Sequence, residues 1–373
     1  MSIFLIILGF LLFIGLVLVH EWGHFIAARR AGVEVEEFGI GFPPKGWGKK
    51  IKTKKSEFLF TINLLPLGGF VRLKGENDSA KHKGSYGAAS LPDKTKIMVA
   101  GVVMNLVTAY VLLVVIALIG MPQIIPDQYK VDSDSKITRQ LENKGKVTIA
   151  KVLTDSPAQK ADIQVNDQIQ LINGNVISNP MQISEITKEY AGRAIEIKLN
   201  RGGEDIVKTV QLNAKDSGQG YLGLSSQSEQ KGVELRRSTW SAPVVAGGVI
   251  AQFTELTFRG LGSIITNLFS GDPGKAGDQV SGPVGIAVVI KEGSKIGVQF
   301  ILMIIAIISL SLAIMNILPI PALDGGRLFV TYLFRIFKWD LTKERESVIH
   351  GAGFAFLMGL FVLITVVDVR RFF

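Results

Sequence analysis

Two histidines and a glutamate, spaced as H-E-x-x-H, are the residues of this sequence best suited to chemistry. His20 and His24 are four residues apart, so on a helix they share one face and both imidazoles can bind one metal ion. Glu21 lies beside them, where it can accept a proton from an attacking water molecule. The spacing therefore indicates two metal ligands and a general base. The alternative is that the histidines mark the interfacial end of a helix.

This motif follows directly on an apolar segment. Residues 3–19 contain no charged side chain, and the next five residues bring two imidazoles and a carboxylate. Ionisable side chains at membrane depth are costly and usually functional, which favours metal binding over the alternative. The chain contains no cysteine, so thiolate zinc sites are excluded and any metal must be held by His, Asp or Glu.

A zinc site of this kind needs a third protein ligand and an open position for water. Asp324 is the best candidate, because acidic residues are rare in the apolar parts of the chain. Pro319 and Pro321 break the helix just before it, and Gly325-Gly326 permits a tight turn just after it. Irregular backbone at membrane depth should line a cavity, which favours a ligand over a simple helix-end cap.

The other two of the four histidines are weaker ligand candidates. His82 lies in the polar segment 77–96, which we expect to be mobile. His350 begins the last apolar segment and remains an open alternative.

Four uncharged runs are long enough to cross a bilayer, which needs about 20 residues. They are residues 3–19 extended by the motif, 97–120, 296–323 and 347–367. Together with a hydrophobic content of 47%, they predict a polytopic α-helical membrane protein with a soluble part. The first run has no basic residue before it and no small-residue cleavage site, so we expect it to be retained as a span.

The basic residues indicate the orientation in the membrane. The formal net charge is +9, and residues 29–96 carry 14 Lys or Arg against 7 Asp or Glu. The connection 327–345 is basic as well. By the positive-inside rule both segments are cytoplasmic, residues from about 121 to 295 lie outside, and the predicted metal site lies near the cytoplasmic face. This distribution favours membrane orientation and argues against nucleic-acid binding.

Two apolar stretches between the first two spans have the composition of β-strands. They are residues 58–65 and 69–73, and residues 66–68 (Pro-Leu-Gly) predict a turn between them. Residues 38–44 add a turn or an edge. We expect a membrane-reentrant β-hairpin at about residues 38–75, because so apolar a hairpin is tethered between spans. The alternative is an ordinary small cytoplasmic sheet.

A domain of different character follows a polar linker at residues 121–145. Residues 146–214 contain S-P-A-x-x-A and N-D-x-I-x-x-I-N-G, with an Asn-Gly turn and a closing hairpin. These signatures resemble the circularly permuted, α+β PDZ domain of bacterial proteins. Asp162 and Asn166 stand where that family usually has glycine, but Asn tolerates a positive φ, so the fold is not endangered.

Residues 215–295 are harder to interpret. The uncharged stretch 238–254 is followed by Glu255 and Arg259, which predicts an amphipathic helix on the outer membrane surface instead of a fifth span. The sequence G-Y-L-G-L at residues 220–224 resembles a carboxylate-binding loop but follows the predicted domain. We therefore expect five parts, residues 1–120, 121–145, 146–214, 215–295 and 296–373.

The motifs together resemble one family. H-E-W-G-H in the first span, N-x-x-P-x-P-x-L-D-G-G in the third and a PDZ domain between the second and third are similar to bacterial site-2 proteases, the intramembrane zinc metalloproteases of regulated intramembrane proteolysis. The resemblance covers essentially the whole chain, although better-studied enterobacterial members have two PDZ domains. It implies Zn²⁺ bound by His20, His24 and Asp324, with Glu21 as the catalytic base.

The same resemblance implies a substrate-binding region. Asn316 matches an asparagine implicated in holding the substrate backbone. Phe60, Ile62 and Asn63 lie in the β element whose edge is thought to pair with an unwound substrate helix. Residues 282–285 (Gly-Pro-Val-Gly) match a recurring segment ahead of the third span.

The expected activity is cleavage of the transmembrane segment of single-span membrane proteins, with anti-sigma factors and remnant signal peptides as the family's usual substrates. We expect a multi-pass protein of the bacterial cytoplasmic membrane, whose PDZ domain lies outside as a size filter or peptide-binding module. Two other functions stay open, an ion- or proton-coupled transporter that uses the His, Glu and Asp cluster and a non-catalytic PDZ scaffold. The lack of two matching broken helices argues against a transporter, and the complete motif argues against a scaffold.

Overall fold

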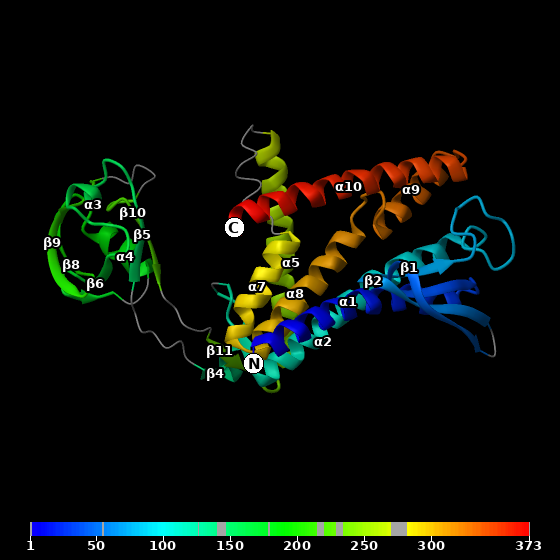
Figure 1. Ribbon diagram of the computed structural model, residues 1–373, viewed down its shortest axis with the longest axis horizontal. Helices are drawn as coiled ribbons and strands as arrows, with labels where there is room; N and C mark the ends of the chain where they lie inside the picture. Colours follow the sequence, from blue (N-terminus) through cyan, green and yellow to red (C-terminus); the bar gives the residue numbers. More distant parts are fainter. Residues whose placement is uncertain are drawn as a thin grey trace. The chain divides into compact units, whose positions relative to one another are not determined.

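The computed structural model describes residues 2–53, 56–125, 127–139, 147–177, 180–214, 220–228, 234–269 and 282–372. The chain divides into two compact units (Figure 1). The first, here called the helical unit, combines Met1–Thr138 with Leu235–Phe373. The second, the inserted unit, is Arg139–Glu234.

Among the described residues, four helices are long and apolar enough to cross a membrane, which confirms the number of predicted spans. These helices are α1 (Ser2–Arg30), α2 (Leu91–Ile119), α8 (Val298–Ile317) and α10 (Lys343–Phe372). The first predicted run continues without interruption through the histidine motif. The motif therefore lies inside a long helix and not at its end.

Close contact between α1 and α2 depends on a glycine within the motif. A Cβ atom at Gly23 would lie 2.5 Å from the main-chain oxygen of Ala100, so any side chain there would push the two helices apart. α8 packs against both helices. Leu16 of α1 shares one buried cluster with Ile301 and Ile305 of α8, and Leu113 of α2 shares another with Met303.

The predicted break in the third span is confirmed. α8 ends at Ile317, and the next helix, α9 (Asp324–Ile336), starts at the candidate ligand itself. Cβ atoms at Gly325 and Gly326 would lie 2.3 Å from the oxygen of Ile317 and 1.8 Å from that of Ile320. The paired glycines therefore let α9 begin directly against the carbonyl groups of the break.

The strands β1 (Val35–Thr53) and β2 (Ser56–Leu73) form a two-stranded sheet next to α1 (Figure 1). The predicted turn at residues 66–68 lies where β2, although one continuous strand over Ser56–Leu73, reverses its direction along β1, and Gly68 has a φ of +86° there. The two predicted strands, however, do not pair with each other as a hairpin. Residues 37–40 of β1 lie between them, paired with 59–62 on one side and with 69–72 on the other.

Residues 38–44, predicted to be a turn or an edge, contain a central strand segment at 38–40, and β1 then reverses its direction between Ile40 and Trp47. A Cβ atom at Gly39 would lie 2.4 Å from the ring of Phe70, and one at Gly41, where φ is +76°, would lie 2.4 Å from the oxygen of Leu65. Glycine is required here by close packing in a bent sheet. Composition alone does not show that a central strand segment precedes the turn.

The polar segment 77–96, predicted to be mobile, is instead tied down. Tyr86 is only 1% exposed and belongs to a core cluster with Phe25 and Ile97. Lys94 is completely buried and forms an ion pair with Asp78. The helix α2 begins within this segment, where the Ser90 side chain caps its first turn. Polar composition was therefore a poor guide to mobility.

The described residues in the rest of the helical unit form a small sheet and two more helices, α5 and α7. The sheet has the order β3-β11-β4 and is built from Met121–Pro122, Leu235–Arg237 and Lys136–Arg139. Residues 121–139, predicted to be a linker, thus contribute two strands and the 3₁₀ helix η1 (Asp132–Asp134). α5 (Ala242–Phe269) packs its first turns on α2 and α8, and α7 (Pro283–Ile296) packs on α1, α8 and α10.

The inserted unit is an α+β fold around its own apolar core. Its main sheet has the order β10-β5-β6-β8-β9, with β7 paired to β6. The strands are Val147–Val152 (β5), Gln168–Ile172 (β6), Asn175–Val176 (β7), Ala194–Arg201 (β8), Glu204–Gln211 (β9) and Leu224–Ser228 (β10), and the helices are Pro157–Lys160 (α3) and Pro180–Glu189 (α4). Ile149, Ile169 and Ile197 are fully buried in its core.

The predicted end of this domain at residue 214 is too early. β10 pairs with β5, and Leu222 is buried in the same core, so the G-Y-L-G-L loop belongs to the unit. The two non-glycine positions behave as expected. Asp162 and Asn166 have φ values of 54° and 73°, in the left-handed region that glycine usually occupies.

Candidate metal centre

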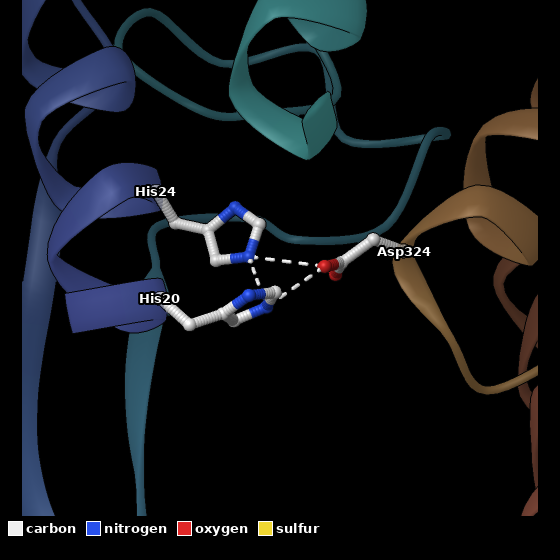
Figure 2. Close-up of side chains that lie close together, drawn as sticks. All are labelled: His20, His24 and Asp324. Carbon is white, nitrogen blue, oxygen red and sulfur yellow. Dashed lines mark hydrogen bonds and ion pairs between the residues drawn. The ribbon is translucent and has the colours of Figure 1, made fainter. Parts of the chain in front are cut away.

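The two histidines and the aspartate predicted as ligands come together, although Asp324 lies 304 residues after His20 in the chain (Figure 2). Asp324 Oδ2 lies 3.0 Å from His20 Nε2 and 3.2 Å from His24 Nε2. The two Nε2 atoms are 3.1 Å apart. Figure 2 shows both rings, carried by α1, turned toward the carboxylate at the start of α9. His20 and His24 are 8% and 7% exposed.

This donor set fits a zinc ion. Zinc binds His nitrogen and carboxylate oxygen at about 2.0–2.2 Å in tetrahedral geometry, so two ligand atoms lie about 3.3 Å apart. The three separations of 3.0, 3.1 and 3.2 Å are close to that value. The residues therefore offer three protein ligands and leave a fourth position for water, as in catalytic zinc sites.

The helix α2 supplies the wall behind the two rings. His24 Nδ1 lies 2.7 Å from the main-chain oxygen of Ile97, and the Asn105 amide lies 3.1 Å from His20 Nδ1. Between them, a Cβ atom at Gly101 would lie 2.5 Å from His24 Nε2 and 2.7 Å from His20 Nε2. These three residues, spaced by four, therefore form one face of α2 against the centre.

Sequence reasoning missed this face of α2. A signal for it was present, because Gly101 and Asn105 are spaced by one helical turn within an apolar run. A buried asparagine inside a span is costly and therefore informative.

The predicted base, Glu21, is held by the sheet. Its Oε2 accepts a hydrogen bond of 3.0 Å from the main-chain N–H of Val71. Gly69 packs beside it, since a Cβ atom there would lie 3.0 Å from Leu18 and 3.7 Å from Glu21. The segment 69–73 of β2 thus runs along α1 next to the base.

The residues predicted to bind substrate occupy different settings. Asn316 is half-buried in the last turn of α8. Phe60 has strand neighbours on both sides, Phe38 and Lys49, so its segment is not an open edge. Asn63 is buried and donates a hydrogen bond of 3.0 Å to the oxygen of Gly41, which gives its side chain a role within the sheet.

The remaining histidines do not join the metal group. His350 Nδ1 accepts a hydrogen bond of 3.1 Å from the N–H of Ala322, whose φ is +80°. It therefore stabilises the break before Asp324. The alternative ligand assignment for His350 is not supported by this geometry. His82 is exposed and its main-chain oxygen accepts hydrogen bonds from Ser85.

A buried ionic cluster holds the start of α9. The Arg327 guanidinium lies 4.9 Å from the centre of the Tyr86 ring, donates to the oxygen of Glu76, and lies 3.5 Å from Glu346 of α10. Burial opposes its charge, but the neighbouring Tyr86, Glu76 and Glu346 groups raise the pKa of Arg327 above its usual value. Glu346 also accepts a hydrogen bond from the N–H of Asp78. We call these five residues the Arg327 cluster.

An H-E-x-x-H helix, a distant acid that completes a three-donor centre and a carboxylate beside it define a zinc metallopeptidase. Comparisons with known proteins agree. The profile of peptidase family M50 matches residues 8–360. A Clostridium perfringens protein, provisionally named a zinc metalloprotease, is 32% identical over 370 residues, with 98% of each chain covered.

Two named relatives extend the comparison. The zinc metalloprotease RasP of Bacillus licheniformis is 28% identical, and the regulator of sigma-W protease RasP of Bacillus subtilis is 26% identical. Each alignment covers 98% of this chain and 99% of the relative. The chain therefore belongs to peptidase family M50, the site-2 protease family. It is a zinc metalloendopeptidase and a multi-pass membrane protein.

Proposed function

We propose that this metalloprotease cuts the transmembrane segments of single-span membrane proteins, within the bilayer, in regulated intramembrane proteolysis. The observation that carries the proposal is the convergence of His20 and His24, inside the membrane-length helix α1, with Asp324, just after the membrane-length helix α8. Anti-sigma factors and remnant signal peptides are the substrate types that the family resemblance favours. Within the described parts of the chain, no structural feature favours the transporter or the scaffold over this activity.

The proposed roles follow from the contacts around the centre. His20, His24 and Asp324 hold the zinc ion, which when bound activates water and polarises the scissile carbonyl. Glu21 accepts the proton of the attacking water and returns it to the leaving amine. The hydrogen bond from Val71 N–H orients the Glu21 carboxylate for this transfer.

Substrate must be presented as an extended chain, because a helix hides its peptide groups. We assign this presentation to the edge of β2 at residues 69–73 in place of Phe60, Ile62 and Asn63. The reason is that the 69–73 segment is an outer segment of the sheet and lies beside the base. A substrate strand added there would recover main-chain hydrogen bonds at the position of the cut. Asn316 remains a candidate for holding the substrate backbone.

Membrane placement of the sheet is supported by its surface. Five large apolar side chains of the sheet are between 45% and 65% exposed, namely Phe42, Trp47, Ile62, Leu64 and Leu65. Such a patch is unfavourable in water and favourable in a bilayer. With the basic segments in the cytoplasm, the metal centre lies near the cytoplasmic side and the inserted unit lies outside.

The inserted unit is proposed to be a PDZ domain that filters substrates by size or binds a peptide terminus. Three features support this role. β10 is an edge strand, α4 contacts it, and the loop with Leu222 precedes it. An edge strand beside a helix is the setting in which an extended peptide adds to a sheet.

One assay tests the activity. Purified protein in detergent is given a single-span substrate, with and without a zinc chelator, beside Glu21→Gln. We expect cleavage only by the untreated wild type, and equal cleavage by Glu21→Gln would refute the proposal. Metal analysis of His24→Ala and Asp324→Ala tests the ligands separately, and undiminished zinc in either variant would remove that ligand.

A further inference from the structure

Asn105 is fully buried in the middle of α2 and touches the metal centre through only one ring. Its amide nitrogen Nδ2 lies 3.1 Å from His20 Nδ1, on the side of the ring opposite the Nε2 atom that faces Asp324. The amide oxygen, Oδ1, is buried and has no hydrogen-bond partner. A polar side chain in this setting is costly, so a function must offset the cost.

The chemistry of histidine fixes what Asn105 must do when metal is present. A metal binds the lone pair of a neutral imidazole nitrogen, so with Nε2 as the ligand the proton resides on Nδ1. His24 Nδ1 has the Ile97 oxygen as its acceptor at 2.7 Å. His20 Nδ1 has the Asn105 amide in the corresponding place.

We propose that Asn105 is a positioning residue of the metal centre, whose amide oxygen accepts the Nδ1–H hydrogen bond of His20. The inference rests on the proposed assignment of His20 as a ligand. Asparagine also suits the metal-free protein, because turning the amide end for end presents Nδ2 to an unprotonated Nδ1. One residue thereby serves both tautomers of His20.

Two neighbouring residues, Gly101 and Ser309, place the α2 backbone so that Asn105 reaches the His20 ring. Gly101, one turn earlier, lets the helix come close enough for Asn105 to reach the ring. On the other side, the Ser309 hydroxyl of α8 donates a hydrogen bond of 2.8 Å to the main-chain oxygen of Asn105. That bond holds the helix without involving the amide, which makes Ser309→Ala a matched control.

The test is zinc affinity of the full-length protein in detergent, measured by competition with a chromophoric chelator. We expect Asn105→Leu, which has no acceptor, to bind zinc about 10–100-fold more weakly. Asn105→Asp keeps an acceptor and should bind zinc as tightly as the wild type or more tightly. Ser309→Ala should stay within about twofold of the wild type. If Asn105→Leu fails to fold, Asn105→Ala replaces it, with the same expected loss.

The outcomes separate a positioning role from packing. A role in packing alone would make leucine the better substitute for asparagine in an apolar helix, and it would leave aspartate the worse one. Wild-type affinity in Asn105→Leu, or an Asn105→Asp as weak as Asn105→Leu, would overturn the inference. His20→Ala is measured in parallel. Zinc retained at full affinity by His20→Ala would instead refute the ligand assignment on which the inference rests.

Discussion

At the scale of single residues, the candidate metal centre depends on two glycines as much as on the side chains of the proposed ligands. The Cβ position of Gly101 lies within 2.7 Å of the Nε2 atoms of both His20 and His24, so any side chain there would occupy the space between α2 and the candidate metal centre. Gly23 similarly lets α1 approach α2 at Ala100. The chemistry of His20 and His24 is thus possible only because two glycines sit at the helix crossing.

This requirement gives a sharp prediction. Gly101→Ala should weaken zinc binding by about 100-fold, because the methyl group displaces the imidazoles from their common point. Gly15→Ala is the matched control on α1, since nothing lies within 4 Å of a Cβ atom there. Zinc titration of both variants is the measurement. Similar affinities for the two variants would contradict the steric argument.

A second prediction at the residue scale is that the inserted unit loses stability as the pH falls. Buried Asp167 is bound by Arg201 through two contacts of 2.7 Å. Burial opposes its charge, but the bonds from Arg201 and from the Gln164 N–H hold the pKa of Asp167 below its usual value. Hydrogen bonds from Gln164 and Lys208 lower the pKa of Asp162 to about 2. Both carboxylates therefore stabilise the fold above their ordinary pKa of about 3.9, and this stabilisation is lost as the pH falls.

Urea unfolding of residues 139–234 checks this expectation. The free energy of unfolding should fall between about pH 5 and about pH 2. At neutral pH, Asp167→Asn should be less stable by about 2 kcal/mol, because it loses charge-assisted bonds to Arg201. Its stability should also fall less steeply in acid. A wild-type stability that stays flat across this range would show that these carboxylates do not contribute.

Some residues of the candidate metal centre could be predicted from the sequence, and one could not. His20, His24 and Asp324 were predicted as a group, because ionisable residues in apolar segments are rare enough to be paired by depth alone. Asn105 was not predicted, since its role depends on which face of α2 meets α1. That information arises from packing, which a single sequence does not contain.

At the scale of elements, the Arg327 cluster determines where α9 begins. Arg327 lies one turn after Asp324, and its contacts reach Tyr86 and Glu346 from two other segments. Glu346 is 4% exposed, so its charge is tolerated only with Arg327 beside it. The position of Asp324, the proposed third ligand, therefore depends on a cluster outside the candidate metal centre.

Glu346→Gln tests this dependence. It keeps the shape but removes the charge, which leaves Arg327 buried beside weaker partners. We expect faster hydrogen exchange in the first turn of α9 and roughly tenfold weaker zinc binding, as for loss of other outer-shell support. Exchange in β5 and β6 of the inserted unit serves as an internal standard. Lys343→Gln, at an exposed site on the same helix, should change neither quantity.

The membrane-length helices could be predicted from the sequence, whereas the order of the β1–β2 sheet and the packing of segment 77–96 could not, for a physical reason. The four spans follow from hydropathy, which is local and strong. The β1–β2 sheet does not, because its centre is the Gly-containing segment 37–40 and its order depends on contacts between distant residues. Segment 77–96 was misjudged in the same way, since the burial of Tyr86 and Lys94 depends on other parts of the chain.

At the scale of the whole molecule, the inserted unit is joined to the helical unit through two adjacent strands. The chain leaves along β4 and returns along β11, which are neighbours in the small sheet. The Thr138 hydroxyl donates a hydrogen bond of 3.2 Å to the oxygen of Leu235 across this junction. The two ends of the insertion are therefore close together, and a short loop can replace it without disturbing either strand.

Replacing residues 140–233 by a short Gly-Ser loop should consequently leave the metal centre intact. No residue of the predicted centre comes from the inserted unit, so zinc affinity should stay within about twofold of the wild type. Cleavage of a short single-span substrate should continue, and Glu21→Gln in the shortened protein should abolish it. If the unit acts as a size filter, the shortened protein should also cut a substrate with a bulky outer domain, which the wild type rejects. Continued rejection of that substrate would remove the filter role, whereas loss of zinc would show that the helical unit needs the insertion to fold.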